Sequence, residues 1–318
     1  MFEALSVCPA RNSLHELAVR IDVVLRIIEV GPRDGLQNEP VPISTETKRD
    51  FIAALMSSGL KEIEATSFVS PKWVPQLGDA KDLWPQLPPG GLYSALVPNG
   101  RGLEGALEVG VERIAVFTAA SPAFVQKNIN MSIEESIAGF ADVIKTFRNK
   151  VPGGFVRGYV STIFACPYAG EIEPTQVVRV AESLFEIGVD EVSLGDTIGV
   201  GAAVDVRRLN EHLQSIEKSK IAWHFHDTRG TAIACVSAAL DLGYESFDAS
   251  AGGLGGCPYA PGAGGNLATD DLVYFLERSG ITTGIDRVAL AQASLPILEA
   301  AGRLPIAKAQ VAQLAVCK

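Results

Sequence analysis

The sequence predicts a TIM (β/α)8 barrel with extra C-terminal helices. One reason is a joint that recurs, in which an apolar-periodic helix ends at a glycine and a short mixed segment leads to a β-branched or aromatic residue; its copies begin at Gly59, Gly110, Gly188 and Gly243. Glycine closes a helix readily because it adopts the left-handed backbone conformation, and the segment after it suits a strand that re-enters a buried sheet. The predicted strands also end about thirty residues apart on average, which suits eight β/α units closed into a barrel.

Eight runs rich in apolar and β-branched residues are predicted as strands. In chain order they are residues 26–30, 62–66, 92–97, 113–117, 156–163, 191–194, 221–225 and 246–250. Helices are expected between them. The segment 132–147 opens with Ser132 and Glu135 in the form of a capping box, and the segment 174–187 opens with a proline, which is favoured in the first turn. Two further helices, at about 267–278 and 287–301, are expected near the C-terminus.

A doubly wound open sheet is the structural alternative, because parallel strands joined by helices leave a similar pattern in both folds. Against it, neither GxGxxG nor GxxxxGK[ST] follows the first predicted strand, which runs instead into the segment GPRDG at 31–35. No low-complexity linker divides the chain. We therefore predict an N-terminal extension at 1–25, a catalytic barrel at 26–252, and a glycine-rich active-site loop with helices packed on the barrel at 253–318.

Composition and charge narrow the class of protein. With 47% hydrophobic and 20% charged residues, the 318-residue chain has the composition of a packed globular enzyme. Its net charge of -10, without Lys/Arg runs or basic amphipathic stretches, argues against binding of nucleic acid or of a membrane surface. The five cysteines form no CxxC pair, and the first 25 residues lack the apolar core of a secretory signal. A cytoplasmic location is therefore expected.

His224 and His226 are the most informative pair of residues, because they come at the end of the predicted strand 221–225. Side chains alternate along a strand with a period of two, so both imidazoles should point the same way, as two nitrogen ligands of one divalent metal ion would. Two polar residues on a solvated face are the alternative. The chain holds only four histidines, and the use of two at the mouth of a buried strand favours the metal site.

Further polar residues follow the ends of other predicted strands, where the active site of a β/α barrel lies. Asp34 would add an oxygen ligand to the two histidine nitrogens. Asn266 could supply a fourth ligand or could cap the helix expected at 267–278, and both interpretations stay open. Mixed nitrogen and oxygen ligation with open positions suits Mg²⁺ or Mn²⁺ better than structural zinc. The sequence therefore predicts a divalent-metal site.

Four more residues are candidates for catalysis, each with a structural alternative. Arg33 and Glu64 could instead form an ion pair with each other, and Asp196 could form a turn after its strand. Cys257 lies in a glycine-rich segment that could fold over a ligand and carry the thiol with it, or could hold an inert side chain. Asp227 is expected to orient a histidine or to form a turn, since the period of two aims it away from the histidine face.

Four long, separated blocks of the sequence resemble the 3-hydroxy-3-methylglutaryl-CoA lyase family. They are VGPRDGLQNE at 30–39, TSFVSPKWVPQ at 66–76, SLGDTIGVG at 193–201 and GLGGCPYA at 253–260, within a match that runs from about residue 26 to the C-terminus. The resemblance implies a divalent-metal TIM barrel that cleaves a β-hydroxyacyl-CoA, here 3-hydroxy-3-methylglutaryl-CoA, into acetyl-CoA and a keto acid. It also implies a homodimer.

The resemblance implies roles for individual residues. It places the metal on Asp34, His224, His226 and Asn266. It implies that Arg33 polarises the thioester carbonyl and stabilises the enolate, and that Cys257 transfers a proton from a mobile loop. The catalytic set expected on this basis is Arg33, Asp34, Glu64, Asp196, His224 and Cys257.

Two positions depart from the family pattern. Arg229 stands before Gly230, where a tyrosine is typical, and Gly264 stands where a serine is common. A cation near the metal site could favour another carboxylate, so a lyase for citramalyl-CoA or for a longer branched glutaryl-CoA is an alternative. A Claisen-condensing synthase of the isopropylmalate or homocitrate type is another, although only about fifty residues follow Asn266. A non-catalytic protein that binds a CoA ester or a metal is a third.

Overall fold

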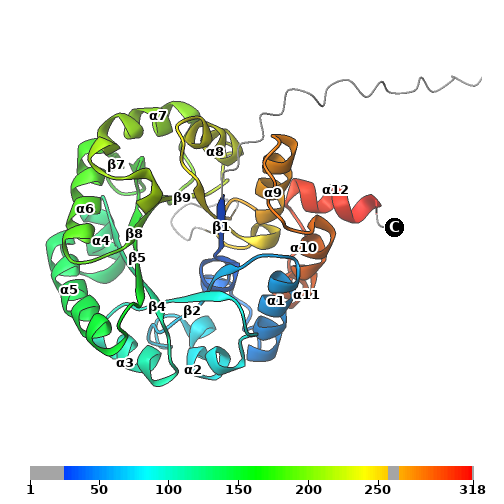
Figure 1. Cartoon of the computed structure of the whole chain (residues 1–318), viewed down its shortest axis with the longest axis horizontal. Coiled ribbons are helices and arrows are strands. Elements are labelled where there is room, and N and C mark those ends of the chain that lie inside the picture. Colours follow the sequence, from blue (N-terminus) through cyan, green and yellow to red (C-terminus); the bar gives the residue numbers. More distant parts are fainter. Residues whose placement is uncertain (1–24, 257–264, 317–318) are drawn as a thin grey trace, which may run out of the picture.

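Eight parallel strands close into a barrel in the computed structural model, which describes residues 25–256 and 265–316 (Figure 1). Around the barrel the strands follow the order β1-β10-β9-β8-β5-β4-β3-β2, and β2 pairs with β1 to complete the circle. The strands are β1 (Arg26–Glu29), β2 (Glu62–Ser67), β3 (Leu92–Leu96), β4 (Arg113–Ala119), β5 (Phe155–Ser161), β8 (Glu191–Asp196), β9 (Ile221–Phe225) and β10 (Ser246–Ala249). The predicted barrel is confirmed, and the open-sheet alternative is excluded.

All eight predicted strands form, with ends that differ by a few residues. β5 ends at Ser161 rather than at 163, because Thr162 takes a left-handed backbone conformation (φ 60°) that no strand continues. The four glycines of the recurring joint have φ between 78° and 107°, as predicted for residues that end helices. A short antiparallel pair, β6 (Ala165–Cys166) and β7 (Gly170–Glu171), was not predicted because two-residue strands carry no periodicity.

Helices surround the barrel and cover its outer face (Figure 1). Ser132 and Glu135 form the predicted capping box at the start of α5, with Glu135 N donating to Ser132 Oγ at 3.0 Å. The segment predicted as one helix at 287–301 is two helices, α10 and α11, which meet at Ser294. The helices are α1 (Thr45–Ser57), α2 (Ala80–Leu83), α3 (Gly100–Glu108), α4 (Pro122–Ile129), α5 (Ile133–Lys150), α6 (Pro174–Glu186), α7 (Ala203–His212), α8 (Ala232–Asp241), α9 (Thr269–Arg278), α10 (Arg287–Ala293), α11 (Leu295–Ala300) and α12 (Lys308–Val316).

The C-terminal helices gather on one side of the barrel, where α10 and α11 pack against α1 (Figure 1). Buried Glu29, at the end of β1, connects the start of α9 to the barrel through hydrogen bonds. Its carboxylate accepts hydrogen bonds from Thr269 Oγ1 at 2.6 Å, from Ala251 N at 3.0 Å and from Gly31 N at 2.8 Å. Burial raises the pKa of Glu29 to about 7. The carboxylate thereby links the first loop of the barrel to α9.

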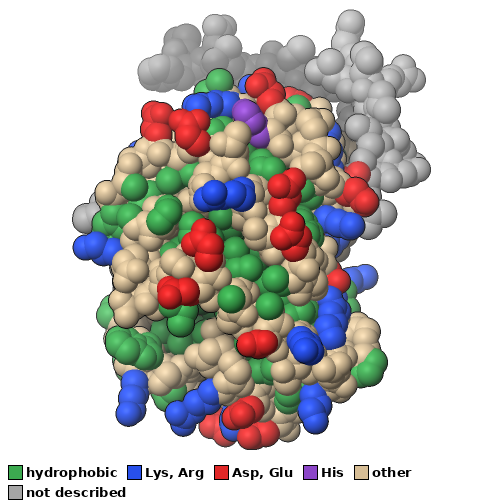
Figure 2. Space-filling model, turned by 90° about the vertical axis from the view of Figure 1, so that its left-hand side faces the viewer, with side chains coloured by type: hydrophobic (Ala, Val, Ile, Leu, Met, Phe, Trp, Pro, Cys, Tyr) green, Lys and Arg blue, Asp and Glu red, His purple; other side chains and the backbone are tan. Residues whose placement is uncertain are grey.

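The surface carries charges of both signs. On the face drawn in Figure 2, Lys and Arg side chains are interspersed with Asp and Glu among apolar residues. None of the helices in the described part of the chain combines the length and the apolar composition that a membrane span needs. The three-part division at 1–25, 26–252 and 253–318 stays a prediction.

Candidate metal centre and active site

Asp34, His224 and His226 meet at the carboxyl ends of the strands. Each offers one possible metal-ligating atom, and these three atoms lie within 4.8 Å of one another. His224 Nε2 lies 3.8 Å from Asp34 Oδ2, and the centroids of the two imidazole rings are 5.2 Å apart. The Asp34 side chain is 24% exposed, so this side of the cluster is open to a ligand. The predicted convergence is confirmed.

Local structure explains how these side chains meet. After β1 the backbone makes a π-helical turn, η1 (Gly31–Gly35), in which Asp34 N and Gly35 N both donate to Val30 O. This tight turn, with Pro32 near its start, carries Asp34 to the mouth of the barrel. His224 lies within β9 and His226 just beyond it, two positions apart, so their side chains share a face.

Asn266 reaches the same cluster and does not cap a helix. The N-cap of α9 is Ala268. Asn266 Nδ2 donates to Asp34 Oδ2 at 2.9 Å and to Leu254 O at 3.2 Å. Gly255 (φ +119°) leaves room for this amide, because a Cβ there would lie 2.7 Å from Asn266 Nδ2. Of the two interpretations, the structure excludes the helix cap.

The donor set fits a divalent cation. Burial acts to raise the pKa of Asp34, but Arg33, His224 and His226 outweigh it and hold that pKa below its usual range, so the carboxylate is ionised. Burial, together with neighbouring His224, lowers the pKa of His226 to about 4, so that ring is neutral at pH 7. Asn266 Oδ1 and His226 Nδ1 are buried and lack a hydrogen-bond partner within the described residues. An ionised carboxylate, a neutral imidazole and an unpaired amide oxygen are the donors that such an ion needs.

Arg33 lies beside this cluster, held between two carboxylates. Its Nη1 donates to Asp34 Oδ1 at 2.7 Å, and its Nη2 pairs with Glu64 Oε2 at 2.7 Å. Tyr159 Oη donates to the same Glu64 oxygen at 2.7 Å, and the Arg33 guanidinium lies 5.2 Å from the centre of the Tyr159 ring. The Arg33–Glu64 ion pair that the sequence allowed is therefore present. It holds the guanidinium rigidly next to the metal-ligand cluster.

Asp196 lies apart from the cluster. Its carboxylate is buried and accepts hydrogen bonds from Val200 N at 3.1 Å and from Gly201 N at 2.8 Å, so it shapes the loop after β8. Thr197, in the same loop, lines the central cavity, whereas Asp196 is absent from that lining. The turn interpretation thus describes its contacts, and any catalytic effect would pass through the loop.

Arg229 binds the loop that follows β8. It is exposed, and its Nη1 donates to Ile198 O at 2.9 Å and to Gly199 O at 3.0 Å. It is absent from the cavity lining. Carbonyl groups of the loop after β8 bind its guanidinium, and an influence of Arg229 on the choice of substrate stays a prediction. Asp227 Oδ1 accepts from Ala232 N at 3.0 Å, at the start of α8, and is thus a turn residue.

Cys257 and Gly264 lie outside the described residues. The chain before them runs along the site, since Gly256 lines the central cavity and Leu254 O accepts from the Asn266 amide. The part that Cys257 plays stays a prediction.

A large cavity opens from the metal-ligand cluster. It has a volume of about 1230 Å³, and Arg33, Asp34, His224 and His226 all line it. It extends towards α3, α4 and α5, and its apolar far wall is formed by side chains of α3 and α5 together with Phe117 of β4: Leu103, Leu107, Phe140 and Val143. Trp73, in the loop after β2, lines the cavity too and is 85% exposed. A polar end and an apolar extension suit a ligand with a charged head and a long arm.

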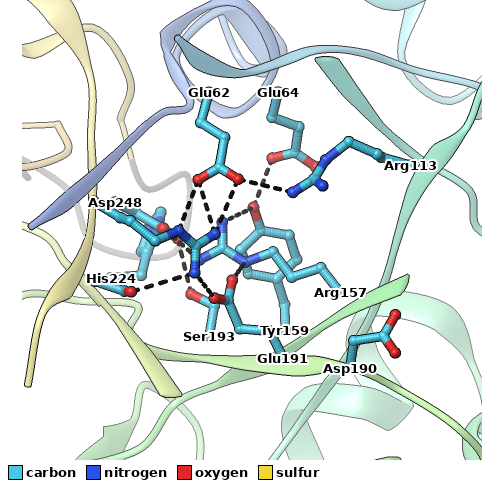
Figure 3. Close-up of polar contacts among 12 residues, drawn as sticks. Glu62, Glu64, Arg113, Arg157, Tyr159, Asp190, Glu191, Ser193, His224 and Asp248 are labelled. Carbon is cyan, nitrogen blue, oxygen red and sulfur yellow. Dashed lines mark hydrogen bonds and ion pairs between the residues drawn. The ribbon is translucent and has the colours of Figure 1, made fainter. Parts of the chain in front are cut away.

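Sequence reasoning missed the residue that holds His224. Asp248 Oδ2 lies 3.1 Å from His224 Nδ1, and Asp248 Oδ1 accepts from Arg157 Nη2 at 2.6 Å (Figure 3). Asp248 and Arg157 both lie on predicted strands, but neither was among the candidate site residues. The available signal was an ionised residue in the middle of the strand SFDA, since a buried charge requires a partner.

Comparison with known proteins defines the class. A family model described as HMGL-like matches residues 24–297, and the chain belongs to this family. The predicted family and the predicted type of enzyme, a carbon–carbon lyase, are confirmed.

Individual relatives are similar over nearly their whole length. The chain is 47% identical over 294 residues to the 3-hydroxy-3-isohexenylglutaryl-CoA/hydroxy-methylglutaryl-CoA lyase of Pseudomonas aeruginosa, covering 92% of this chain and 97% of that one. It is 46% identical over 297 residues to the mitochondrial hydroxymethylglutaryl-CoA lyase of Bos taurus, covering 92% and 90%. A crystal structure of hydroxymethylglutaryl-CoA lyase from Pseudomonas aeruginosa superposes with a TM-score of 0.89 at 47% identity, covering 92% of this chain and 98% of that one. Because one relative is mitochondrial, the cytoplasmic location stays a prediction.

Proposed function

We propose that this protein cleaves 3-hydroxy-3-methylglutaryl-CoA to acetyl-CoA and acetoacetate, using Mg²⁺ or Mn²⁺ held by Asp34, His224, His226 and Asn266. The observation that carries the proposal is the meeting of three ligand atoms within 4.8 Å beside a buried guanidinium. Relatives named as lyases of this substrate, at 46–47% identity, support it.

The reaction needs a base, a cation and an acid. The C3 hydroxyl loses its proton, the C2–C3 bond breaks with its electron pair moving onto C2 and the thioester oxygen, and C3 becomes the ketone of acetoacetate. The bound metal ion would supply Lewis-acid activation of the hydroxyl. An Asp34-centred group would take the hydroxyl proton, and its carboxylate is ionised.

Arg33 would stabilise the enolate. Its Nε is buried and has no hydrogen-bond partner among the described residues, so the guanidinium keeps a free donor besides those used by Asp34 and Glu64. A preorganised cation at the thioester oxygen lowers the barrier because negative charge develops there in the transition state. Cys257 would then protonate C2 to give acetyl-CoA, and the thiolate would recover its proton from solvent.

A lyase for a longer branched glutaryl-CoA is the second candidate. The apolar far wall of the cavity, which includes Phe117 and Phe140, could take a larger substituent at C3 than a methyl group. The 47%-identical relative from Pseudomonas aeruginosa, named for the isohexenyl as well as the methyl substrate, supports this possibility. A homodimer and a cytoplasmic location complete the proposal, and light scattering and cell fractionation test them.

A coupled assay for acetyl-CoA release tests the function. The substrates are 3-hydroxy-3-methylglutaryl-CoA, citramalyl-CoA and an isohexenyl analogue, each with chelator-treated enzyme and with Mg²⁺ restored. Metal-dependent release from the methyl substrate supports the proposal, and comparable kcat/KM for the isohexenyl analogue would broaden it. If acetyl-CoA were released from citramalyl-CoA alone, citramalyl-CoA would replace 3-hydroxy-3-methylglutaryl-CoA as the proposed substrate. Thiol release from acetyl-CoA mixed with 2-oxo acids, without any cleavage, would show a synthase.

A further inference from the structure

Asp248 lies inside the barrel, where its carboxylate contacts three polar side chains. Its side chain is completely buried. Asp248 Oδ2 accepts from Ser193 Oγ at 2.8 Å and lies 3.1 Å from His224 Nδ1, while Asp248 Oδ1 pairs with Arg157 Nη2 at 2.6 Å (Figure 3). The three partners come from β8, β9 and β5, so they fix the carboxylate from three strands.

The interaction with His224 determines which ring nitrogen carries the proton. Arg157 Nη2 and Ser193 Oγ both donate to Asp248, one to each oxygen, so this carboxylate acts as an acceptor. When His224 Nδ1 donates to it, the neutral ring keeps its lone pair on Nε2. Nε2 is the nitrogen that faces the candidate metal ligands, since it lies 3.8 Å from Asp34 Oδ2. A ligating histidine needs such an unprotonated nitrogen, and a carboxylate behind the ring commonly provides it.

Arg157 is held in turn by a charged network at the other end of the barrel. Its Nε lies 3.1 Å from Glu191 Oε1, and Glu191 pairs with Arg26, which also binds Glu62 at 2.8 Å. Arg113 binds the same Glu62 at 2.8 Å (Figure 3). Within the described residues, Arg157 contacts Asp248 and so reaches the histidine through one carboxylate, whereas the ion pair of Arg113 is with Glu62.

We propose that Asp248 is a positioning residue for His224, which it holds in the tautomer and orientation that bind the metal ion, and that Arg157 keeps Asp248 in place. This inference rests on the proposed metal site but concerns residues outside the ligand set. A purely structural ion pair is the alternative, because buried charge pairs also occur without any functional role.

Binding of Mn²⁺ separates the two explanations. The Asp248→Asn variant can place its amide nitrogen towards His224 Nδ1, which would put the ring proton on Nε2 and block ligation. We expect its Mn²⁺ dissociation constant, measured on chelator-treated full-length protein by electron paramagnetic resonance, to rise roughly 10- to 100-fold. The thermal midpoint of the metal-free protein reports any general loss of stability in the same samples.

Matched variants provide the control. Arg113→Met removes a half-buried guanidinium from the same network, and its Mn²⁺ affinity should stay within about twofold of the wild type even where its thermal midpoint falls. Arg157→Met should weaken Mn²⁺ binding, and Ser193→Ala should do so severalfold; Ser193→Ala decides the question if Asp248→Asn does not fold.

Three outcomes would overturn the proposal. Unchanged Mn²⁺ affinity in Asp248→Asn would refute the positioning role but not the metal site. If Asp248→Asn does not fold, unchanged affinity in Ser193→Ala has the same meaning. Equal weakening in Arg113→Met would show that the network acts only through stability. If the wild-type protein binds no Mn²⁺, the metal site itself fails.

Discussion

Replacement of Arg33 by methionine tests two proposed roles of this side chain, one in stability and one in catalysis, and the two effects can be measured separately. The guanidinium neutralises Glu64, whose side chain is fully buried, and it pairs with Asp34, which is 24% exposed. In Arg33→Met, Asp34 can still be hydrated through the cavity. Glu64 cannot, since its only remaining hydrogen bond in the described structure comes from Tyr159.

The substitution should reduce both the folding free energy and kcat. A buried carboxylate left without its partner costs about 3–5 kcal/mol of folding free energy, which lowers the thermal midpoint of a chain of this size by roughly 4–8 °C. Loss of a preorganised group that stabilises an oxyanion costs about 10²- to 10³-fold in kcat. We expect Arg33→Met to show both effects.

A second substitution separates them. Glu64→Gln in the Arg33→Met background removes the unpaired charge and keeps an acceptor for Tyr159, so thermal unfolding should return most of the way to the wild-type midpoint. Acetyl-CoA release should stay low, because no cation is restored. The Glu64→Gln single variant serves as the control. Recovery of kcat in the double variant, or kcat within about threefold of wild type in Arg33→Met, would refute the role of Arg33 as a charge stabiliser.

Two further predictions concern other parts of the chain. The folded-state pKa of Glu29, about 7, lies above its ordinary value of 4.5, so the native state binds the extra proton and the free energy of unfolding should fall by roughly 3 kcal/mol as pH rises from 4 to 8. Urea titrations should show this slope in the wild type and a flatter one in Glu29→Gln; identical slopes would contradict the assignment. Trp73, which is 85% exposed on the cavity, should change its fluorescence when acetyl-CoA is added, and Trp73→Ala should raise KM severalfold with a smaller effect on kcat. A fall in kcat alone would place Trp73 in the chemical step instead.

The fold was predictable because its signals are local. The glycine that ends each helix and the β-branched run that follows it lie within a few residues of each other, and Gly59 and Gly188, among others, have the positive φ that this pattern requires. Three of the proposed metal ligands were predictable for a related reason: Asp34, His224 and His226 lie at or shortly after the ends of predicted strands, and parallel strands bring their carboxyl ends to one place.

The rest depends on contacts between distant parts of the chain. Asn266 has a sequence context that suits a helix cap as well as a ligand, and only the position of Asp34, 232 residues away, decides between them. Asp248 and Arg157 lie on predicted strands but were not among the candidate site residues, because the pairing that explains them forms only when β5 and β10 close into one barrel. The partners of Arg229 likewise come from a distant segment, since carbonyl groups of the loop after β8 bind its guanidinium.

Anomalous diffraction from crystals grown with Mn²⁺ tests the central claim most directly. We predict a single strong peak among Asp34, His224 and His226, at about 2.0–2.3 Å from one atom of each, with Asn266 Oδ1 beside it. A peak elsewhere, or none at a Mn²⁺ concentration that supports full acetyl-CoA release, would contradict the proposed metal centre and the mechanism built on it.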